Sequence, residues 1–188
     1  AVVACLGVLF FGTLKGIAAA IILSLIGLSS QTAQPRISVI GRKRGADVLR
    51  PLSPEHPDDE TFDGLLVIRP EGSIFFVNAP YVGEQISALI EQHHPRVVAL
   101  DMSRIPDIEY SALQMLIEGE ARFAERGVTL WLAALNPGVL EVVRRAGLDE
   151  RLGRDLMLFN ARAAIERFQA LQAGAGTATA PAAAESGG

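Results

Sequence analysis

The sequence predicts an α/β domain, in which a mostly parallel β-sheet is packed with helices, preceded by a transmembrane helical hairpin. Three features predict this: apolar runs of strand length such as Val97–Leu100, amphipathic helical patterns between such runs, and an apolar stretch over residues 1–28 with one charge. From residue 64 the elements follow the order β-β-α-β-α-β-α-β-α, with one more strand before them. This alternation is typical of helices packed on a parallel sheet.

A β-α-β segment that begins at Val97 is expected at the centre of the sheet. Val97–Leu100 is apolar without alternation, which indicates a strand covered on both faces. Asp107 is expected to cap the following helix, and Gly127 to end it in a left-handed conformation. Residues 128–134 then form a second buried strand. The helix is predicted to be amphipathic, with apolar residues at Leu113, Leu116, Ile117, Ala121 and Ala124.

Turn and cap residues predict the remaining elements of the domain. Leu65–Ile68 and Ile74–Val77 are expected to form a hairpin, because residues 70–73 between them have turn chemistry. Three asparagines are expected to begin helices: Asn78, Asn136 and Asn160. These helices are predicted to end before His93, at Gly147 and near residue 172, and a strand over Leu156–Phe159 precedes the last one. From Ala173 onward, small residues predict a disordered tail.

The apolar stretch at the start of the chain is expected to lie in a membrane. One straight helix over about thirty residues would be ~45 Å long, more than a ~30 Å hydrocarbon core, and would place Lys15 near its centre. We therefore predict the end of one membrane helix at residues 1–11 and a second helix from about Gly16 to Ser30. A secretory signal is disfavoured because its basic start and cleavage site are not in place. The remaining alternative is a buried helical hairpin of a soluble protein.

Basic residues after the second apolar segment predict its orientation. They are Arg36, Arg42, Lys43, Arg44 and Arg50, and they indicate a multi-pass protein of the cell membrane with the rest of the chain in the cytoplasm. Residues 42–44 are interpreted as the tip of a hairpin between strands at residues 37–40 and 48–49, with a lipid-headgroup or targeting patch as the alternative. Residues 51–63 are predicted to be a solvated loop. Metal binding by its acidic residues, Asp58, Asp59 and Glu60, is the alternative there.

Composition and motifs argue against several classes of function. With 17 basic and 21 acidic residues, a net charge of -4 and no basic face, a nucleic-acid surface is not expected. A serine hydrolase would need a histidine beside Ser111, but His56 lies in a proline-rich loop and His93 and His94 end a different helix. A phosphate-cradling glycine-rich loop is also missing from the sequence. We therefore expect no catalytic residue, no cofactor and no metal, and Cys5 is expected to be a small buried side chain.

Four short segments stand in an order that supports a family resemblance. They are Leu65-Leu66-Val67-Ile68-Arg69, Ile74 to Ala79, Asp101-Met102-Ser103, and Ile108 to Leu113. Together they resemble the STAS domain of the sulfate permease (SulP) family of anion transporters. Residues 7–17 and 36–42 are similar to that family's last membrane segments and to its passage into the domain. The resemblance covers about residues 1–172. It implies membrane helices at 1–30, a passage with the first strand and the acidic loop at 31–63, a STAS core at 64–172 and a tail at 173–188.

The resemblance also marks a candidate regulatory site at Ser111. The family pattern at the helix start is an Asp, two Ser or Thr residues and a Gly, where this chain has Glu109, Tyr110, Ser111 and Ala112. In soluble STAS relatives, the anti-sigma factor antagonists, the second hydroxyl is phosphorylated by a partner kinase, and Ser111 matches it. The site then comprises Ser111 with the loop residues Asp107, Glu109 and Tyr110. The alternative is that Ser111 is only a residue of the first helical turn.

For function, the resemblance implies the carboxy-terminal part of a secondary active inorganic anion transporter of the sulfate or bicarbonate type, and not an enzyme. Its cytoplasmic STAS domain would regulate or assemble the transporter. The implied partners are the lipid membrane, an inorganic anion bound by an upstream membrane domain, that domain itself, a second copy in a homodimer, and a kinase or regulatory protein at the STAS surface. The alternative is a membrane-tethered STAS regulatory module that acts by partner switching.

Overall fold

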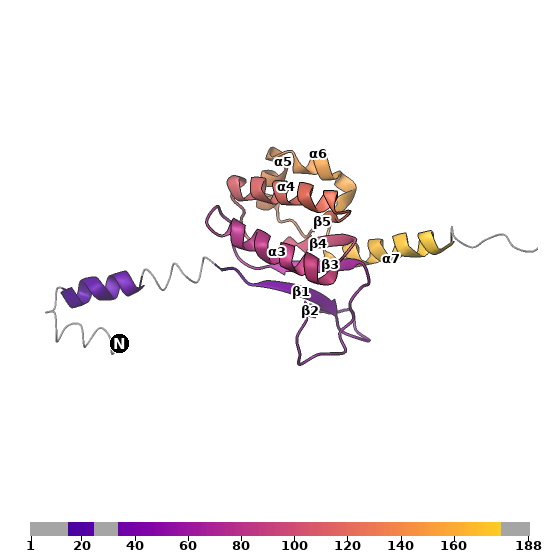
Figure 1. Ribbon diagram of the computed structural model, residues 1–188, viewed down its shortest axis with the longest axis horizontal. Helices are drawn as coiled ribbons and strands as arrows, with labels where there is room; N and C mark the ends of the chain where they lie inside the picture. Colours follow the sequence, from indigo (N-terminus) through magenta and orange to yellow (C-terminus); the bar gives the residue numbers. More distant parts are fainter. Residues whose placement is uncertain (1–14, 25–33, 178–188) are drawn as a thin grey trace, which may run out of the picture. The chain divides into compact units, whose positions relative to one another are not determined.

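The computed structural model describes residues 15–24 and 34–177 (Figure 1). The chain divides into two units, Ala1–Pro35 and Arg36–Gly188. In the first unit, residues 15–24 form a helix whose large apolar side chains are more than half exposed: Ile17, Ile21, Ile22 and Leu23. These described residues overlap the second membrane segment, which was predicted from about Gly16 to Ser30. The other predicted membrane segment, residues 1–11, lies outside the described residues.

None of the helices in residues 15–24 and 34–177 combines the length and the apolar character that a membrane span requires. The predicted hairpin therefore has one described part, the helix over residues 15–24. Of the passage predicted at residues 31–63, residues 36–63 belong to the same compact unit as the domain core.

The second unit is built on a mixed, mostly parallel sheet of six strands. Its strands are β1 Ile37–Arg42, β2 Leu49–Pro51, β3 Leu65–Pro70, β4 Val97–Asp101, β5 Thr129–Ala133 and β6 Met157–Leu158, in the spatial order β2-β1-β3-β4-β5-β6. The four strands from β3 to β6 are parallel, and β1 is antiparallel to both β2 and β3. The predicted central position of β4, between two parallel neighbours, is confirmed.

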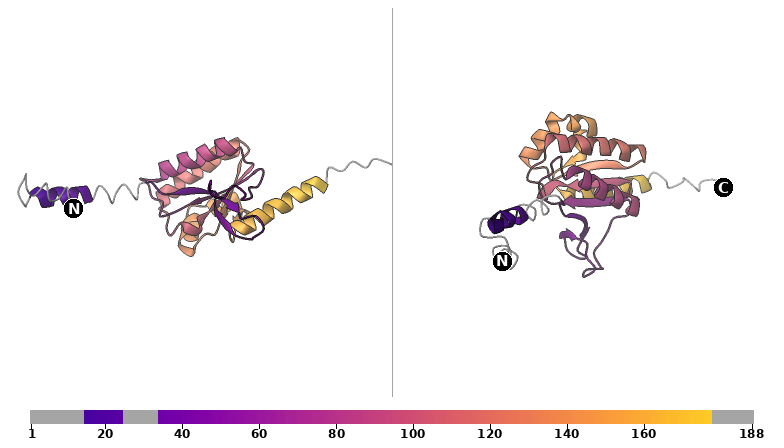
Figure 2. Two further views of the ribbon diagram at one scale, coloured as in Figure 1. Left: turned by 90° about the horizontal axis from the view of Figure 1, so that it is seen from below. Right: turned by 60° about the vertical axis from the view of Figure 1, so that its left-hand side comes forward.

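Helices cover both faces of the sheet, so the central strands β3, β4 and β5 are largely buried on both sides. The helices are α3 Ala79–His93, α4 Tyr110–Glu125, α5 Pro137–Arg145, α6 Leu148–Leu152 and α7 Ala161–Thr177, with 3-10 turns η1 Met102–Arg104 and η2 Arg154–Leu156. Leu66, Val98 and Leu130 pack towards α3, α4 and α5, whereas Val67, Ala99 and Trp131 pack towards α7. The left view of Figure 2 shows α3 and α7 on opposite sides of the strands. Burial on both faces explains why the strands are apolar at consecutive positions.

The second unit has hydrophobic clusters of its own. Among the described residues, the cluster under α3, α4 and α5 and the smaller cluster under α7 have their members between Ile37 and Phe168. A core of its own is the condition for a domain that folds by itself, so we expect Arg36–Gly188 to fold alone.

The predicted hairpin between Leu65–Ile68 and Ile74–Val77 is wrong. The antiparallel partner of β3 is β1, with Ile37 opposite Pro70, and Ile74 makes only a parallel bridge to Ile108. The reason is the Asn78 side chain, which accepts a hydrogen bond from the Phe75 amide at 2.9 Å and donates one to the Ser73 carbonyl at 3.0 Å. These bonds fold residues 73–78 into a turn, which competes with an extended strand.

The three predicted asparagines stand at helix starts, but Asn78 makes no side-chain cap, and its side-chain oxygen accepts from the Phe75 amide before the helix. Asn136 and Asn160 accept hydrogen bonds from Val139 and Ala163 three residues on, as expected of caps. Gly127 follows α4 with a φ of 75°, which confirms the predicted left-handed end. The chain after α5 forms the short helix α6, which was not predicted. Helix α7 continues to Thr177, so the predicted disordered tail from Ala173 is wrong over its first residues.

Residues 51–63 form a loop that is exposed over most of its length, as predicted, and its acidic end is held against the β1–β2 hairpin. The Arg50 guanidinium donates to both carboxylate oxygens of Asp59, at 2.7 and 2.8 Å. Arg42 pairs with Glu60 at 2.8 Å, and the backbones of these two residues exchange hydrogen bonds. Two residues of the acidic run therefore neutralise arginines of the hairpin. The hydrogen bonds from Arg50 lower the pKa of Asp59 below its ordinary value of 3.8.

We predict that the Arg50–Asp59 pair stabilises the fold at neutral pH and not in acid. A carboxyl whose pKa is lowered in the folded state contributes stability above its unfolded pKa, and that contribution is lost as the pH falls through the folded pKa. Asp59→Asn should therefore lower the thermal midpoint at pH 7, and the difference from wild type should shrink below pH 3.8. Thermal unfolding followed by circular dichroism over this range measures it. Asp58→Asn, next to it, is the control, and a difference that stays constant into acid would contradict the prediction.

Candidate functional site

Three loops meet at the carboxyl ends of the parallel strands. Because β3, β4 and β5 run in the same direction, the segments that follow them begin at one edge of the sheet. These segments are residues 71–78, residues 102–109 and residues 134–136. In open α/β sheets this edge is the usual place for a functional site.

A buried ion pair joins the ends of β3 and β4. Two nitrogens of Arg69, Nε and Nη2, reach Oδ2 of Asp101 at 2.8 and 2.7 Å. The other carboxylate oxygen, Oδ1, accepts from the Ser103 amide at 3.0 Å and so begins the turn η1. Asp101 is 2% exposed. A carboxylate this deeply buried is tolerated because both of its oxygens have partners.

The loop from Met102 to Glu109 is fixed by backbone hydrogen bonds to the segment after β3. The Gly72 amide donates to the Arg104 carbonyl, and the Ile74 amide donates to the Asp107 carbonyl. In return, the Glu109 amide donates to the Ile74 carbonyl at 2.8 Å. The two segments therefore run side by side as a short parallel bridge between Ile74 and Ile108. Both isoleucines are buried, which anchors the loop to the core.

Asn136, in the segment after β5, is hydrogen-bonded to the same loop. Its side-chain amide donates to the carbonyl of Ile105 at 2.6 Å and to that of Pro106 at 3.2 Å. Its side-chain oxygen accepts from the Val139 amide and caps α5. One side chain thus satisfies a helix start and two loop carbonyls, and it couples the position of the loop to that of α5.

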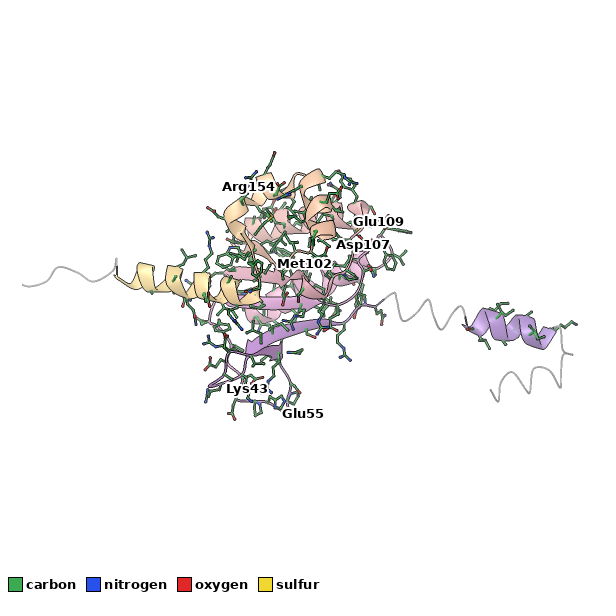
Figure 3. All side chains as sticks on the ribbon, turned by 180° about the vertical axis from the view of Figure 1, so that it is seen from behind. Lys43, Glu55, Met102, Asp107, Glu109 and Arg154 are labelled. Carbon is green, nitrogen blue, oxygen red and sulfur yellow. The ribbon has the colours of Figure 1, made fainter. Side chains whose placement is uncertain are left out.

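The loop ends at the first turn of α4, where the predicted site residues lie. Asp107 was predicted as the helix cap, and this is wrong: Glu109 holds the N-cap position, because residue 108 is still in the bridge to Ile74. The Glu109 carboxylate accepts a hydrogen bond from the Phe76 amide at 3.0 Å. Figure 3 shows Asp107 and Glu109 together at one end of the domain, away from Lys43 and Glu55 on the other side.

Ser111 is the second residue of α4 and is exposed. Tyr110 beside it is 48% exposed, and Phe76, which is held next to Glu109, is 63% exposed. Ser111 is therefore on an exposed surface, next in the chain to the exposed Tyr110 and two to four residues from the exposed Asp107 and Glu109. The amides of the first helical turn and the positive end of the helix dipole are also at this position. A phosphate on Ser111 would be exposed and would add negative charge near Asp107 and Glu109.

Sequence reasoning located Asp107, Glu109, Tyr110 and Ser111 and missed the residues that position them. The structure brings all four to one end of α4. The sequence held a signal for the Arg69–Asp101 pair, because charges of opposite sign directly follow Ile68 and Leu100. In the structure Ile68 and Leu100 are register partners, which brings the two charges together. The ties from Asn136 to the loop had no local signal beyond a helix cap. Among the described residues, His, Cys, Asp and Glu form no group of three suited to a metal ion.

Comparison with protein families matches residues 56–167 to the STAS domain. Curated relatives include High affinity sulfate transporter 1 of Stylosanthes hamata, 29% identical over 181 residues, which cover 88% of this chain and 27% of the relative. Sulfate transporter 1.1 of Arabidopsis thaliana is 28% identical over 160 residues, which cover 80% of this chain and 24% of the relative. The chain spans about a quarter of the length of such relatives.

Solved structures share the fold. The murine Slc26a9 anion transporter in the inward-facing state aligns with a TM-score of 0.76 at 18% identity, over 90% of this chain and 28% of that one. The STAS domain of a SulP transporter from Vibrio cholerae aligns with a TM-score of 0.50 at 22% identity, over 62% of this chain and 92% of that one. At these identities the likeness supports the α/β fold with its mixed, mostly parallel sheet, and the family rests on the sequence match.

We predict that Asn136 stabilises the domain more than a cap alone would. Asn136→Ala should lose the cap, worth about 0.5–2 kcal/mol, and should also leave two loop carbonyls without their donor, at a further cost of about 1–3 kcal/mol. Asn160→Ala is the matched control, because Asn160 caps α7 through the Ala163 amide. Chemical denaturation of both variants measures the difference. Equal losses of unfolding free energy would show that the ties to Ile105 and Pro106 contribute nothing.

Proposed function

Since the chain belongs to the STAS domain family, we propose that it is the carboxy-terminal part of a secondary active inorganic anion transporter of the sulfate permease type. In this proposal the STAS domain regulates or assembles the transporter. The observation that carries it is the extent of the match to sulfate transporters. A match over 88% of the chain is longer than the unit Arg36–Gly188, so it includes part of residues 1–35. The likeness therefore extends beyond the STAS domain into the apolar segment.

In the proposed protein, residues 1–30 contribute the last membrane helices and the STAS domain faces the cytoplasm. Support comes from the apolar composition of residues 1–28 and from the basic residues that follow, beginning with Arg36. The lipid membrane and the transporter's own membrane domain are then direct partners, and a second copy of the chain is a further one. Anion binding belongs to the upstream membrane domain, where half-helix ends face the anion in transporters of this kind.

Ser111 is the proposed regulatory position of this domain. Its exposure at the start of α4 leaves the hydroxyl open to a kinase, and the exposed Phe76 and Tyr110 offer apolar contact area to a protein that docks there. Phosphorylation would add nearly two negative charges beside Asp107 and Glu109. A basic surface of the transporter or of a partner would then bind more strongly, and an acidic one would be repelled. The regulation we propose is a change of docking and not a change of fold.

We expect Ser111→Glu to change transport by the intact parent transporter while leaving the thermal midpoint of Arg36–Gly188 within a few degrees of wild type. Negative charge at the first turn of a helix is favourable, so the domain should remain folded. Sulfate and bicarbonate uptake into vesicles measures the effect, with Ser111→Ala as the uncharged variant. Thr61→Glu, an exposed position before β3, is the control for added charge elsewhere.

Two results would count against the proposal in different ways. If both Ser111 variants transport and dock like wild type, the regulatory role is lost and Ser111 is only a helix-start residue. If the intact parent moves no anion, the transporter assignment is lost, and the membrane-tethered module that acts by partner switching takes its place.

A further inference from the structure

A groove runs between α3 and α4, on the face of the sheet that these two helices cover, and it extends to Ile74 and Ile108 in the loops before them. The two helices lie side by side in Figure 1. The groove has a volume of about 450 Å³, within the range of ligand-binding clefts. Its floor consists of buried apolar side chains from both helices and the adjoining loops: Ile74, Val82, Ile86, Ile108 and Phe123. Apolar surface of this kind favours an apolar occupant over water.

Two glycines inside the helices keep the groove open. Gly83 is in α3 and Gly119 is in α4, and both line the groove. A Cβ added at Gly83 would meet no atom within 4 Å, and one at Gly119 would meet only Phe123, at 3.9 Å. Neither glycine is therefore needed for the packing of α3 against α4, and each weakens its helix relative to alanine. Their effect is to leave space above the floor, which allows another chain to approach closely.

The rim of the groove is acidic. Glu84 and Glu91 of α3 and Glu118 of α4 line it, with Arg122 as the one basic residue in the lining. Glu91 is contacted by Arg126 at 3.3 Å, but both side chains are more than half exposed, so the carboxylate stays available. Met115, also in the lining, is 39% exposed and can adapt its shape to an apolar partner.

We propose that this groove binds an amphipathic helix of a partner protein, with the apolar face between α3 and α4 and Lys or Arg residues against the acidic rim. A helix is favoured over an extended segment because the groove lies between two helices, whose backbone groups are already paired, and offers no free strand edge. Basic flanks are favoured because the lining holds three carboxylates and one guanidinium, so that acidic charge remains in excess even with Glu91 paired to Arg126 outside the lining. This proposal goes beyond regulation at Ser111, which is not in the groove lining.

The test uses the unit Arg36–Gly188 and a synthetic helical peptide of about 14 residues, long enough for about four turns. The peptide carries Leu on one face and Lys on the other, and a matched peptide carries Glu in place of Lys. Titration followed by NMR should place the largest amide shift changes of the Lys peptide on α3 and α4. The Glu peptide should bind at least about tenfold more weakly, because its charges meet the acidic rim.

Groove variants make the result specific. Gly83→Leu and Gly119→Leu fill the groove and should weaken binding of the Lys peptide by about tenfold or more, whereas Gly174→Leu, at an open position in α7, should not. If a leucine variant fails to fold, Glu84→Lys combined with Glu118→Lys tests the rim. Glu125→Lys, near the end of α4 and outside the lining, is its control.

Three outcomes would overturn the proposal. The first is equal binding of the Lys and Glu peptides. The second is a set of shift changes that avoids α3 and α4. The third is a dimer of the unit that forms without peptide and dissociates on Gly83→Leu, which would make a second copy the occupant. Loss of peptide binding in the groove variants, with wild-type transport by the parent, would separate this site from the proposed transport function.

Discussion

The ion pair between Arg69 and Asp101 is the interaction on which the rest of the functional edge depends. It joins β3 to β4 at the point where both strands end, and it leaves Oδ1 of Asp101 to accept from the Ser103 amide. Removing two charges from water is costly, and the pair recovers that cost only because every carboxylate oxygen has a partner. The pair fixes the direction in which the chain leaves β4, into η1 and then into the loop that leads to α4.

The path of the loop after η1 and the start of α4 depend on that direction. The bridge between Ile74 and Ile108 and the ties from Asn136 hold the loop on both sides, so that α4 begins at Tyr110. Ser111 is consequently exposed on rigid backbone and not on a free loop. A negative charge added at Ser111 would change the surface, while the buried face of α4, with Leu113 fully buried, would stay in the core. The same helix forms one wall of the groove opposite α3.

The sequence predicts those parts of the fold that local pattern determines. The apolar run at Val97–Leu100, buried on both faces, and the caps at Asn136 and Asn160 follow from periodicity and side-chain chemistry. The prediction of a strand after β3 was wrong. The apolar residues there resemble a strand, but the hydrogen bonds of the Asn78 side chain fold the segment into a turn. The candidate regulatory residues were named from the resemblance, and their role stays a prediction. The contacts that position these residues were not predicted. Opposite charges directly after two predicted strands, Arg69 and Asp101, were a signal for the ion pair, whereas the reach of Asn136 to the loop is a tertiary contact with no local signal beyond a helix cap.

Hydrogen exchange of single amides tests the central claim, that the Arg69–Asp101 pair positions the loop before Ser111. The amides of Ile74 and Glu109 close the bridge between the loop and the segment after β3. In Arg69→Met they should exchange at least about tenfold faster than in wild type, while Arg50→Met, which breaks the distant pair with Asp59, should leave them unchanged. Unchanged protection of both amides in Arg69→Met would contradict the account.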